Sequence, residues 1–366
     1  MFAVNPVNNQ VAIWMSGRAY GISTMFIVTG FALSSLFPLF YFFSFFWSIN
    51  AIAAPLVFLA MPMPIWALSI VLVYPMRKHF WKTFTDRKKT VPPRMNKIEW
   101  KKLILVPKTF AYYSLLCIAP MRVGMCHSYL HTFGLTEEET KPWFKLDWYF
   151  WLGVVELIAI ATMFVMGHSY KYIGLTWFTL FILQWCNFIV INHPIAERYA
   201  YMANVGMMVF LAQMIHNTPF QYAVLAAYAI RMWLFVPAYK DDATFWEENI
   251  KNFPTVAMAY NQLGLALQKV GKFGTVFDVF VQGIQHRKHD FRLNYNTAGL
   301  LTSNKRFDIV QPFIKAAEEN IDPMNNPEVW HNNLAKMKQF CSDNGVVFNG
   351  NGSKEGASNE IQPVTG

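Results

Sequence analysis

A long stretch without any charged side chain constrains this chain more than any other feature. From Ala19 to Met76 there are 58 consecutive residues with no Asp, Glu, Lys or Arg, whereas a helix needs only about 20 apolar residues to cross a bilayer. The whole chain is 54% hydrophobic and only 14% charged, well below the roughly 25% charge of soluble domains. A water-soluble fold could not bury this much apolar surface, so the sequence predicts an integral membrane protein.

The distribution of positive charge supports this prediction. Residues 1–238 carry 18 Lys and Arg against 8 Asp and Glu, whereas residues 239–366 carry 13 against 14. Ten of the basic residues lie between Arg77 and Lys102, together with two acidic ones, as expected of a cytoplasmic loop under the positive-inside rule. We therefore attribute the net charge of +9 to membrane orientation and expect no nucleic-acid partner.

Prolines and polar segments divide the apolar half into spans. Pro removes a backbone donor from a helix and favours a boundary. Breaks near Pro38 and near Pro62 therefore split the charge-free run into three spans, although two longer, tilted spans would also fit. The total is about eight spans, the other five being Leu103–Met125, Trp148–Gly167, Tyr172–Asn192, Tyr201–Ile215 and Phe220–Ala238.

Orientation follows by counting spans from the basic loop at residues 77–102. With that loop in the cytoplasm, alternate connections lie on the outer face, which is a lumen or a periplasm. The segments predicted on the outer face are residues 1–18, 126–147, 193–199 and everything after 239.

The region after residue 239 shows a helical repeat of the tetratricopeptide type. In that pattern a small residue lies where two helices cross and aromatic side chains fill the space between them. Gly264 and Gly299 occupy this small position in two copies 35 residues apart. The predicted packing residues are Tyr260, Leu263, Gly264, Phe273, Phe280, Tyr295, Gly299 and Pro323.

The predicted fold class is therefore all-α, with three parts. Residues 1–238 form a polytopic helical membrane domain of about eight spans. Residues 239–342 form a short tetratricopeptide α-solenoid on the outer face. The Gly/Asn/Ser-rich tail, residues 343–366, is expected to be disordered.

Ionisable residues inside predicted spans are the first candidates for function, because a charge in hydrocarbon costs about 2.5–3.5 kcal/mol. Glu156 and Arg231 are two such residues. They could line a polar cavity that binds a substrate, or they could form a structural pair or extend their charges to the membrane surface. The sequence leaves both interpretations open.

A second group of candidates lies on the predicted outer face. An Arg beside tyrosines at a membrane boundary suits a lipid-linked phosphate, because guanidinium binds phosphate through two parallel hydrogen bonds. These lipid-phosphate or donor-binding candidates are Glu197, Arg198, Tyr199, Tyr201, Arg18 and Arg122. The alternative is interfacial anchoring, for which such residues are also used. His127 and His131 lack the partner spacing of a zinc site, so no metal is expected.

The order of these segments resembles a known family. Residues 196–206 read Ala-Glu-Arg-Tyr-Ala-Tyr-Met-Ala-Asn-Val-Gly, and two apolar segments, an Asp-x-x-Phe-Trp segment from Asp242 and the repeats follow. Together with residues 2–18, this arrangement resembles the transmembrane and tetratricopeptide repeat-containing O-mannosyltransferase-like proteins of the GT-C glycosyltransferase superfamily. The family's turn reads approximately Ala-(Glu/Asp)-Arg-x-x-Tyr-(Leu/Met)-Pro-x-x-Gly, and this chain departs from it mainly at the Pro position, Ala203.

The resemblance implies transfer of a sugar from a polyprenyl phosphate to a protein hydroxyl or another acceptor on the outer face. It implies no soluble cofactor. A carboxylate near the membrane surface would act as general base, cationic groups would stabilise the departing lipid phosphate, and the repeats would hold the acceptor protein or peptide.

The chain also departs from the family at positions that could carry chemistry. It begins beyond the first outer loop, where the family's presumed catalytic acidic residues lie. Asn5 and Asn8 occupy positions where the family has histidines, and Gln10 occupies the position of a glutamate. Residues 48–50 read Ser-Ile-Asn, where the family would have Ser-Lys-Glu. An amide cannot abstract a proton at neutral pH, so the catalytic residues stay unassigned.

Three functional hypotheses therefore remain. The first is a GT-C-type glycosyltransferase, active, impaired or one part of a split enzyme. The second is a non-catalytic membrane adaptor whose repeats bind a partner protein. The third, a transporter, is disfavoured because the membrane region shows no internal repeat.

Overall fold

The described part of the chain is entirely helical. The computed structural model describes residues 1–8, 11, 18–33, 39–41, 43–44, 100–125, 127, 129–130, 141–168, 171–187, 195–321 and 327–348, and it contains helices and no strand in these ranges. The all-α prediction is thus confirmed for them. Most of the charge-free run, the basic loop up to residue 99, Pro323 and the tail after residue 348 lie outside the described residues, as do His131 and Gln10.

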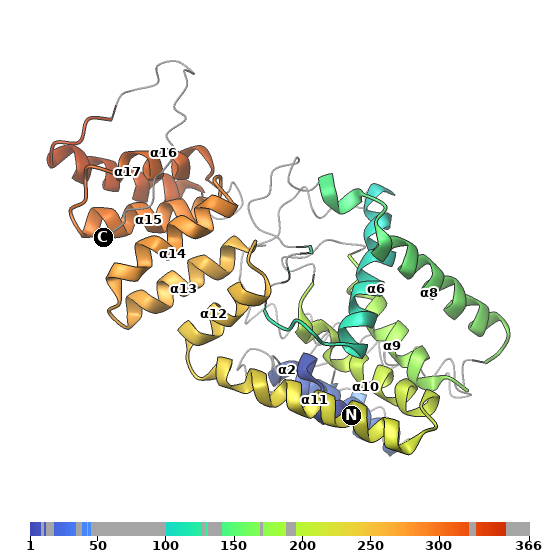
Figure 1. Ribbon diagram of the computed structural model, residues 1–366. Coiled ribbons are helices and arrows are strands. Elements are labelled where there is room, and N and C mark those ends of the chain that lie inside the picture. Colours follow the sequence, from blue (N-terminus) through green and yellow to red (C-terminus); the bar gives the residue numbers. More distant parts are fainter. Residues whose placement is uncertain are drawn as a thin grey trace.

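The first half of the chain forms a packed group of helices (Figure 1). Its α-helices are α2 (Arg18–Ala32), α6 (Leu105–Ile118), α8 (Trp148–Val165), α9 (Ile173–Leu183), α10 (Glu197–Met214) and α11 (Thr218–Phe235). Two 3-10 turns, η1 (Phe2–Val4) and η2 (Pro6–Asn8), precede them and pack against α10 and α11. Three more are described: η7 (Trp100–Ile104) before α6, η8 (Lys141–Phe144) before α8, and η9 (Val236–Tyr239), which leads from α11 into the second half.

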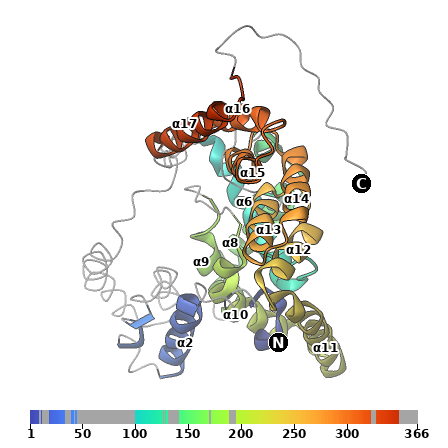
Figure 2. The same cartoon turned by 90° about the vertical axis from the view of Figure 1, so that its left-hand side faces the viewer.

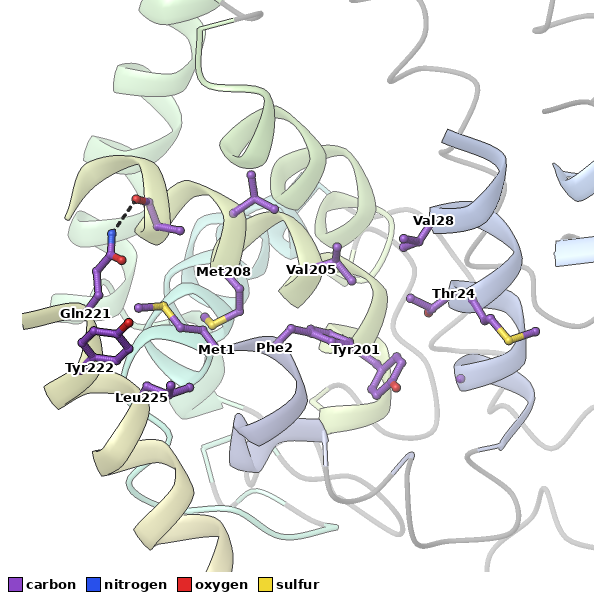
Figure 3. Close-up of a pocket in the computed structure, with 14 residues that line it drawn as sticks. Met1, Phe2, Thr24, Val28, Tyr201, Val205, Met208, Gln221, Tyr222 and Leu225 are labelled. Carbon is purple, nitrogen blue, oxygen red and sulfur yellow. Dashed lines mark hydrogen bonds between the residues drawn. The ribbon is translucent and has the colours of Figure 1, made fainter. Parts of the chain in front are cut away.

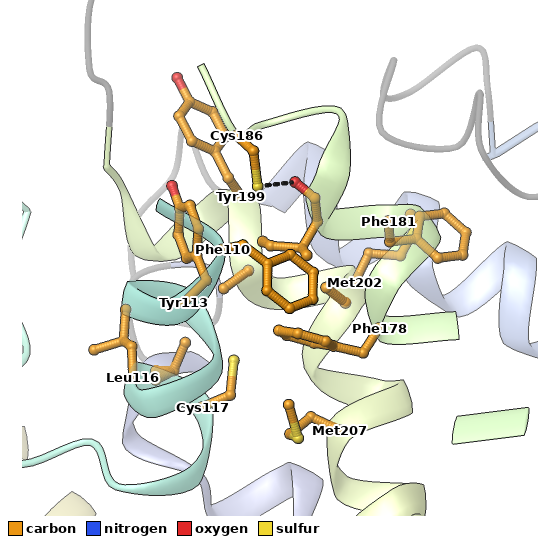
Figure 4. Packing of buried hydrophobic residues seen from close by; sticks show 14 of the residues in the cluster. Phe110, Tyr113, Leu116, Cys117, Phe178, Phe181, Cys186, Tyr199, Met202 and Met207 are labelled. Atoms are coloured by element: carbon orange, nitrogen blue, oxygen red, sulfur yellow. Dashed lines mark hydrogen bonds between the residues drawn. The ribbon is translucent and has the colours of Figure 1, made fainter. Parts of the chain in front are cut away.

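The core of this group lies where α6, α9 and α10 meet. Phe110 of α6 packs edge-on against Phe178 of α9 with ring centroids 5.6 Å apart, and Met202 of α10 is fully buried beside them (Figure 4). Because α6 is buried along almost its whole length, it is the central helix of the described residues of the first half.

Two helices are long and apolar enough to cross a membrane among the described residues. They are Trp148–Val165 and Thr218–Tyr239, and only 17% and 11% of their residues are buried. Trp151 and Val155 on the first and Trp233 on the second are more than half exposed. A core helix of a soluble protein would bury these side chains, whereas an exposed apolar face suits a lipid environment.

The prediction of about eight spans is not confirmed. The predicted span at Leu103–Met125 forms only the 14-residue helix α6, which ends at Ile118 and carries the buried Lys108. The predicted span at Tyr172–Asn192 forms the 11-residue helix α9. Both are shorter than the span of a bilayer, and the three predicted spans before residue 77 fall mostly outside the described residues.

Glycines allow pairs of these helices to cross with their backbones in contact. A Cβ added at Gly206 of α10 would lie 2.4 Å from the carbonyl oxygen of Gly174 on α9, and one added at Gly153 of α8 would lie 1.9 Å from that of Pro107 on α6. No side chain fits at either crossing. Close approach at small residues is the usual way for helices to pack in a membrane.

Helices α6 and α8 run in the same direction. Lys108 in the first turn of α6 pairs with Asp147, the N-cap of α8. Ser114, further along α6, donates to Glu156 in the third turn of α8. The two helices therefore begin at the same end of the pair. Counting spans from the basic loop assumes that successive spans run in opposite directions, and α6 and α8 do not.

The second half is a stack of helices that extends away from α11 (Figures 1 and 2). Its members are α12 (Asp242–Asn252), α13 (Ala257–Lys269), α14 (Phe273–His286), α15 (Phe291–Ser303), α16 (Gln311–Glu319) and α17 (Pro327–Asp343). Consecutive helices pack on one another, and α16 and α17 lie at the end opposite α11 in both views (Figure 2).

The crossing of α13 and α14 depends on small residues. A Cβ added at Gly264 would lie 2.1 Å from a ring carbon of Phe280, and one added at Gly283 would lie 2.7 Å from the Cβ of Tyr260. Tyr260 and Leu263 are buried. Phe273, however, is 54% exposed, because it is the first residue of α14 and lies beyond the crossing.

The second predicted small position, Gly299, does not lie at a close crossing of α15 with α16. Gly299 of α15 has Met337 of α17 as its nearest neighbour, 3.8 Å from an added Cβ, and Tyr295 packs edge-on against Trp330. The Asn296 amide donates to Asn261 Oδ1 at 2.7 Å. These two asparagines are 35 residues apart, which is also the spacing of Gly264 and Gly299.

The two glycines at this spacing should respond in opposite ways to the same change. Gly264→Ala should lower the unfolding free energy by about 1–3 kcal/mol, because the methyl group overpacks the Phe280 contact. Gly299→Ala should raise it by up to about 1 kcal/mol, because Ala fits the available space and restricts the unfolded chain. Thermal unfolding of the detergent-solubilised chain measures both, and equal effects would contradict the crossing described here.

Candidate functional site

Glu197 is the best candidate for a functional carboxylate. It is the first residue of α10 and its side chain is fully buried. Ala196 before it is extended, and its N–H donates to the Tyr113 hydroxyl of α6 at 3.1 Å. A negative side chain is favoured at a helix N-terminus by the helix dipole, so the start of α10 both positions Glu197 and stabilises its ionised form.

The partners of Glu197 come from the segment after α6. The Gly124 N–H donates to Glu197 Oε1, and His127 Nε2 lies 3.5 Å from the same oxygen. The other ring nitrogen of His127 shares a 2.8 Å hydrogen bond with the Tyr112 hydroxyl. Glu197 Oε2 has no hydrogen-bond partner among the described residues. Oε1 is thus held in place, whereas Oε2 is left without a hydrogen bond in the described part of the chain.

Burial determines the proton affinity of this carboxyl. Loss of solvation raises the pKa of Glu197, and His127, the Gly124 N–H and Arg231 only partly offset that increase. A raised pKa makes a carboxylate a better proton acceptor. The arrangement therefore has the components of a general base.

A second polar cluster lies on the other side of Tyr112. Tyr112 stacks on Tyr129 with ring centroids 5.2 Å apart, and the Tyr129 hydroxyl donates to Asp147. Asp147 pairs with the buried Lys108 at 2.9 Å, and Lys108 also donates to the carbonyl oxygens of Trp143 and Lys145. Lys108 is thus neutralised and fully bonded, which indicates a structural role.

The sequence candidates did not include Lys108. The sequence nevertheless distinguishes Lys108, because it is a cation within the predicted span at residues 103–125. Glu156 and Arg231 were chosen for that same reason. The pairing with Asp147 joins positions that a sequence pattern does not connect.

Arg198 precedes the residues of α10 that line an apolar groove. Its guanidinium donates to the Tyr199 hydroxyl at 3.3 Å and also interacts with Tyr20 at the start of α2. Tyr201, one turn further along α10, lines the groove, followed by Val205 and Met208. These positions follow Arg198 at intervals of three and four residues, so they form one stripe of α10.

The groove has a volume of about 650 Å³ and lies between α2, α10 and α11 (Figure 3). Thr24 and Val28 face it from α2, and Tyr222 and Leu225 face it from α11 (Figure 3). Its lining is mostly apolar. A groove of this size accommodates a hydrocarbon chain or another apolar ligand.

The remaining sequence candidates do not meet at one point. Glu156 accepts a hydrogen bond from Ser114 and has no described contact with Glu197. Arg231 donates to the Met121 carbonyl at 3.1 Å, so its charge reaches the segment that holds Glu197. Arg122 is exposed near Tyr112. Arg18 begins α2, but its side chain is outside the described residues.

Tyr199 has a packing role. It is buried and stacks on Trp185 with ring centroids 4.1 Å apart and an interplanar angle of 1°. Its hydroxyl contacts Arg198, so it fixes the cation at the start of α10.

The two N-terminal asparagines are structural. Asn5 donates to the Cys117 carbonyl of α6 at 2.9 Å, and Asn8 accepts from Asn204 of α10 at 3.2 Å. Both are buried. An amide, with its donor and acceptor, satisfies these positions without a buried charge, so the N-terminal segment binds the helices together.

No group of three or more His, Cys, Asp or Glu side chains that could hold a metal ion is found in the described part of the chain. Comparison with protein-family models finds no match for the chain, and comparisons with curated proteins and with solved structures find none either. The function must therefore be argued from the geometry around Glu197 and Arg198.

The Lys108–Asp147 pair makes stability depend on pH. Desolvation tends to raise the pKa of Asp147, but hydrogen bonds from Lys108, Tyr129 and the Phe150 N–H lower it overall. The carboxylate therefore stabilises the fold above its ordinary pKa of 3.8, and this contribution is lost as pH falls through the lowered value.

Asp147→Asn should consequently lower the melting temperature at neutral pH, because a buried ammonium loses its counter-charge. The difference from the unsubstituted chain should shrink as the solution is acidified. Asp242→Asn is the control, because Asp242 pairs with Lys269 on the surface and such pairs contribute little. A deficit that does not vary with pH would show that the charge of Asp147 is not what stabilises the fold.

Proposed function

We propose that the chain is a membrane-embedded glycosyltransferase that uses a polyprenyl-phosphate sugar as donor. One observation carries the proposal. At the start of α10 the buried Glu197 and the cationic Arg198 are consecutive residues, and the positions of α10 that line the apolar groove follow Arg198 along one stripe of the helix. An acid–base group, an anion-binding group and a site for a hydrocarbon chain are the three elements that such a transfer requires.

The groove supports the lipid part of the donor. Its apolar lining between α2, α10 and α11 would take the polyprenyl chain, and α11 is one of the two helices apolar enough to be in the membrane. Arg198 would bind the phosphate, because guanidinium forms bidentate charge-assisted hydrogen bonds with phosphate oxygens.

Glu197 would act as the general base. It would accept the proton of the acceptor hydroxyl as that oxygen bonds to the anomeric carbon of the sugar. The bond from this carbon to the lipid phosphate breaks, and the phosphate leaves with the electron pair. Arg198 would stabilise the negative charge on the leaving group. His127 would orient Glu197, and the helices after α12 would hold the acceptor.

This proposal extends to membrane topology. The two apolar helices among the described residues would be part of a multi-pass domain with about eight spans. The helices of residues 239–342 would form tetratricopeptide repeats on the outer face. The packing of Gly264 on Phe280 and the Asn261–Asn296 contact at the repeat spacing support that assignment.

Transfer from a panel of radiolabelled polyprenyl-phosphate sugars, in membranes containing the full chain, tests the proposal. Glu197→Gln should reduce the rate by about 10² to 10⁴-fold, the range of general base catalysis. Arg198→Ala should raise the KM for the donor, and Val205→Trp should do the same by filling the groove.

Arg306→Ala is the matched control, because Arg306 is an exposed arginine paired with Asp308 in the second half of the chain. It should leave transfer unchanged. No transfer with any donor in the panel would exclude the enzyme and favour the second candidate, a membrane adaptor.

The adaptor is supported by a separate observation. Helices α12–α17 have their own hydrophobic core, which includes Phe280, Leu293, Phe313 and Leu334. A helical stack of this kind can bind a peptide or protein partner without any chemistry. In that function Glu197 would be a structural carboxylate.

A further inference from the structure

A short segment joins Glu197 to the second half of the chain. We refer to residues 121–125 and His127, which follow α6, as the bridging segment. On one side it contacts α10, where the Gly124 N–H and His127 face Glu197. On its other side it contacts α12 and Phe253, the C-cap residue of α12. The bridging segment therefore lies between the two halves of the protein.

Three contacts attach the bridging segment to α12. The Met125 N–H donates to Asn249 Oδ1 at 2.8 Å. Asn252 donates to the Val123 carbonyl at 3.1 Å. The ring of Phe253 packs on His127 with centroids 4.6 Å apart. Successive backbone amides thus have different partners: that of Gly124 binds Glu197 and that of Met125 binds α12.

The close packing at Gly124 leaves no room for the backbone of the bridging segment to move toward α12. A Cβ added at Gly124 would lie 2.7 Å from Asn249 Oδ1 and 3.0 Å from a ring carbon of Phe253. Asn249 is itself buried, and its amide donates to the Phe245 carbonyl at 2.9 Å. The side chain that receives the bridging segment is therefore fixed by its own helix.

We infer that Asn249 and Phe253 are positioning residues for Glu197. They hold the bridging segment so that the Gly124 N–H and the His127 ring stay on the carboxylate, and the first helix of the second half thereby completes the site in the first half. This inference goes beyond the proposed function, because it holds whichever chemistry Glu197 performs.

A double-mutant cycle on the full chain in lipid nanodiscs tests the inference. The melting temperature is measured for the unsubstituted chain, Asn249→Ala, Glu197→Gln and the double variant. Asn249 and Glu197 share no described contact, so independent sites would give additive shifts. We expect the shift caused by Glu197→Gln to shrink by about half or more once Asn249 is replaced.

Asn294→Ala is the matched control. Asn294 is also a buried asparagine, but it bonds to the carbonyls of Lys288 and Asp290 within the second half. It should lower the melting temperature and leave the Glu197→Gln shift unchanged. This control separates loss of the Glu197 contact from general weakening of the helical stack.

Gly124→Ala provides the second perturbation, which remains informative if Asn249→Ala does not fold. It pushes the bridging segment away from α12 without altering α12 itself, and it should reduce the Glu197→Gln shift in the same way. Additive shifts with both Asn249→Ala and Gly124→Ala would overturn the inference.

A spectroscopic measurement supplies a readout that general destabilisation would not change. In chains with ¹³C-labelled histidine, the His127 signal is identified by its loss in His127→Gln, and its chemical shift is followed by NMR. Asn249→Ala should change that chemical shift, because the ring of His127 packs on Phe253, whereas Asn294→Ala should not. An unchanged chemical shift in Asn249→Ala would contradict the inference.

The ionisable groups around Glu197 are the same in the variants that are compared. Those whose charges act on Glu197, or that lie near its carboxylate, come from the bridging segment, α6, α11 and η9: His127, Tyr112, Cys117, Arg231 and Tyr239. Apart from His127→Gln, which serves only to assign the signal, no variant replaces any of them. Neither the melting nor the NMR measurement uses a sugar donor, so failure of the inference and failure of the proposed function are distinguishable.

Discussion

The burial of one carboxylate under a backbone amide connects the two halves of this protein. Glu197 is fully buried, and it receives the N–H of Gly124 from 73 positions earlier in the chain. A buried charge is costly unless hydrogen bonds and opposite charges compensate for it. The segment that supplies this compensation is in turn held by Asn249, 124 positions after Met125. The placement of α10, of residues 121–125 with His127, and of α12 is therefore interdependent.

The apolar helices of the first half are held together in a different way. Where α9 crosses α10 and where α6 crosses α8, backbone meets backbone at Gly174, Gly206 and Gly153. Helices in a bilayer gain little from the hydrophobic effect against one another, so close van der Waals contact must supply their association. Such crossings tolerate no side chain. In consequence the α10 side of the groove is fixed, because α10 packs backbone to backbone on α9 at Gly206.

Local pattern was sufficient for some features of this fold and insufficient for others. Helical class followed from periodicity and composition, and Gly264 could be assigned to a helix crossing because repeat spacing and residue size are local properties. The pairing of Lys108 with Asp147 and the contact of His127 with Glu197 depend on how distant helices meet. The shared direction of α6 and α8 depends on it too. The expected count of spans relied on apolar length alone, whereas α6 and α9 are short helices inside a packed group.

The shared direction of α6 and α8 has a consequence for biosynthesis. Two neighbouring antiparallel helices can leave the ribosome and enter a membrane as a hairpin, because their contacts are close in sequence. The contact between Pro107 and Gly153 cannot form in that way, since the chain after Ile118 must first travel back to the end where α6 began. Contacts between segments far apart in sequence form slowly. This helix pair therefore forms only after α8 has been synthesised, and the flank of α6 that α8 covers stays uncovered by it until then.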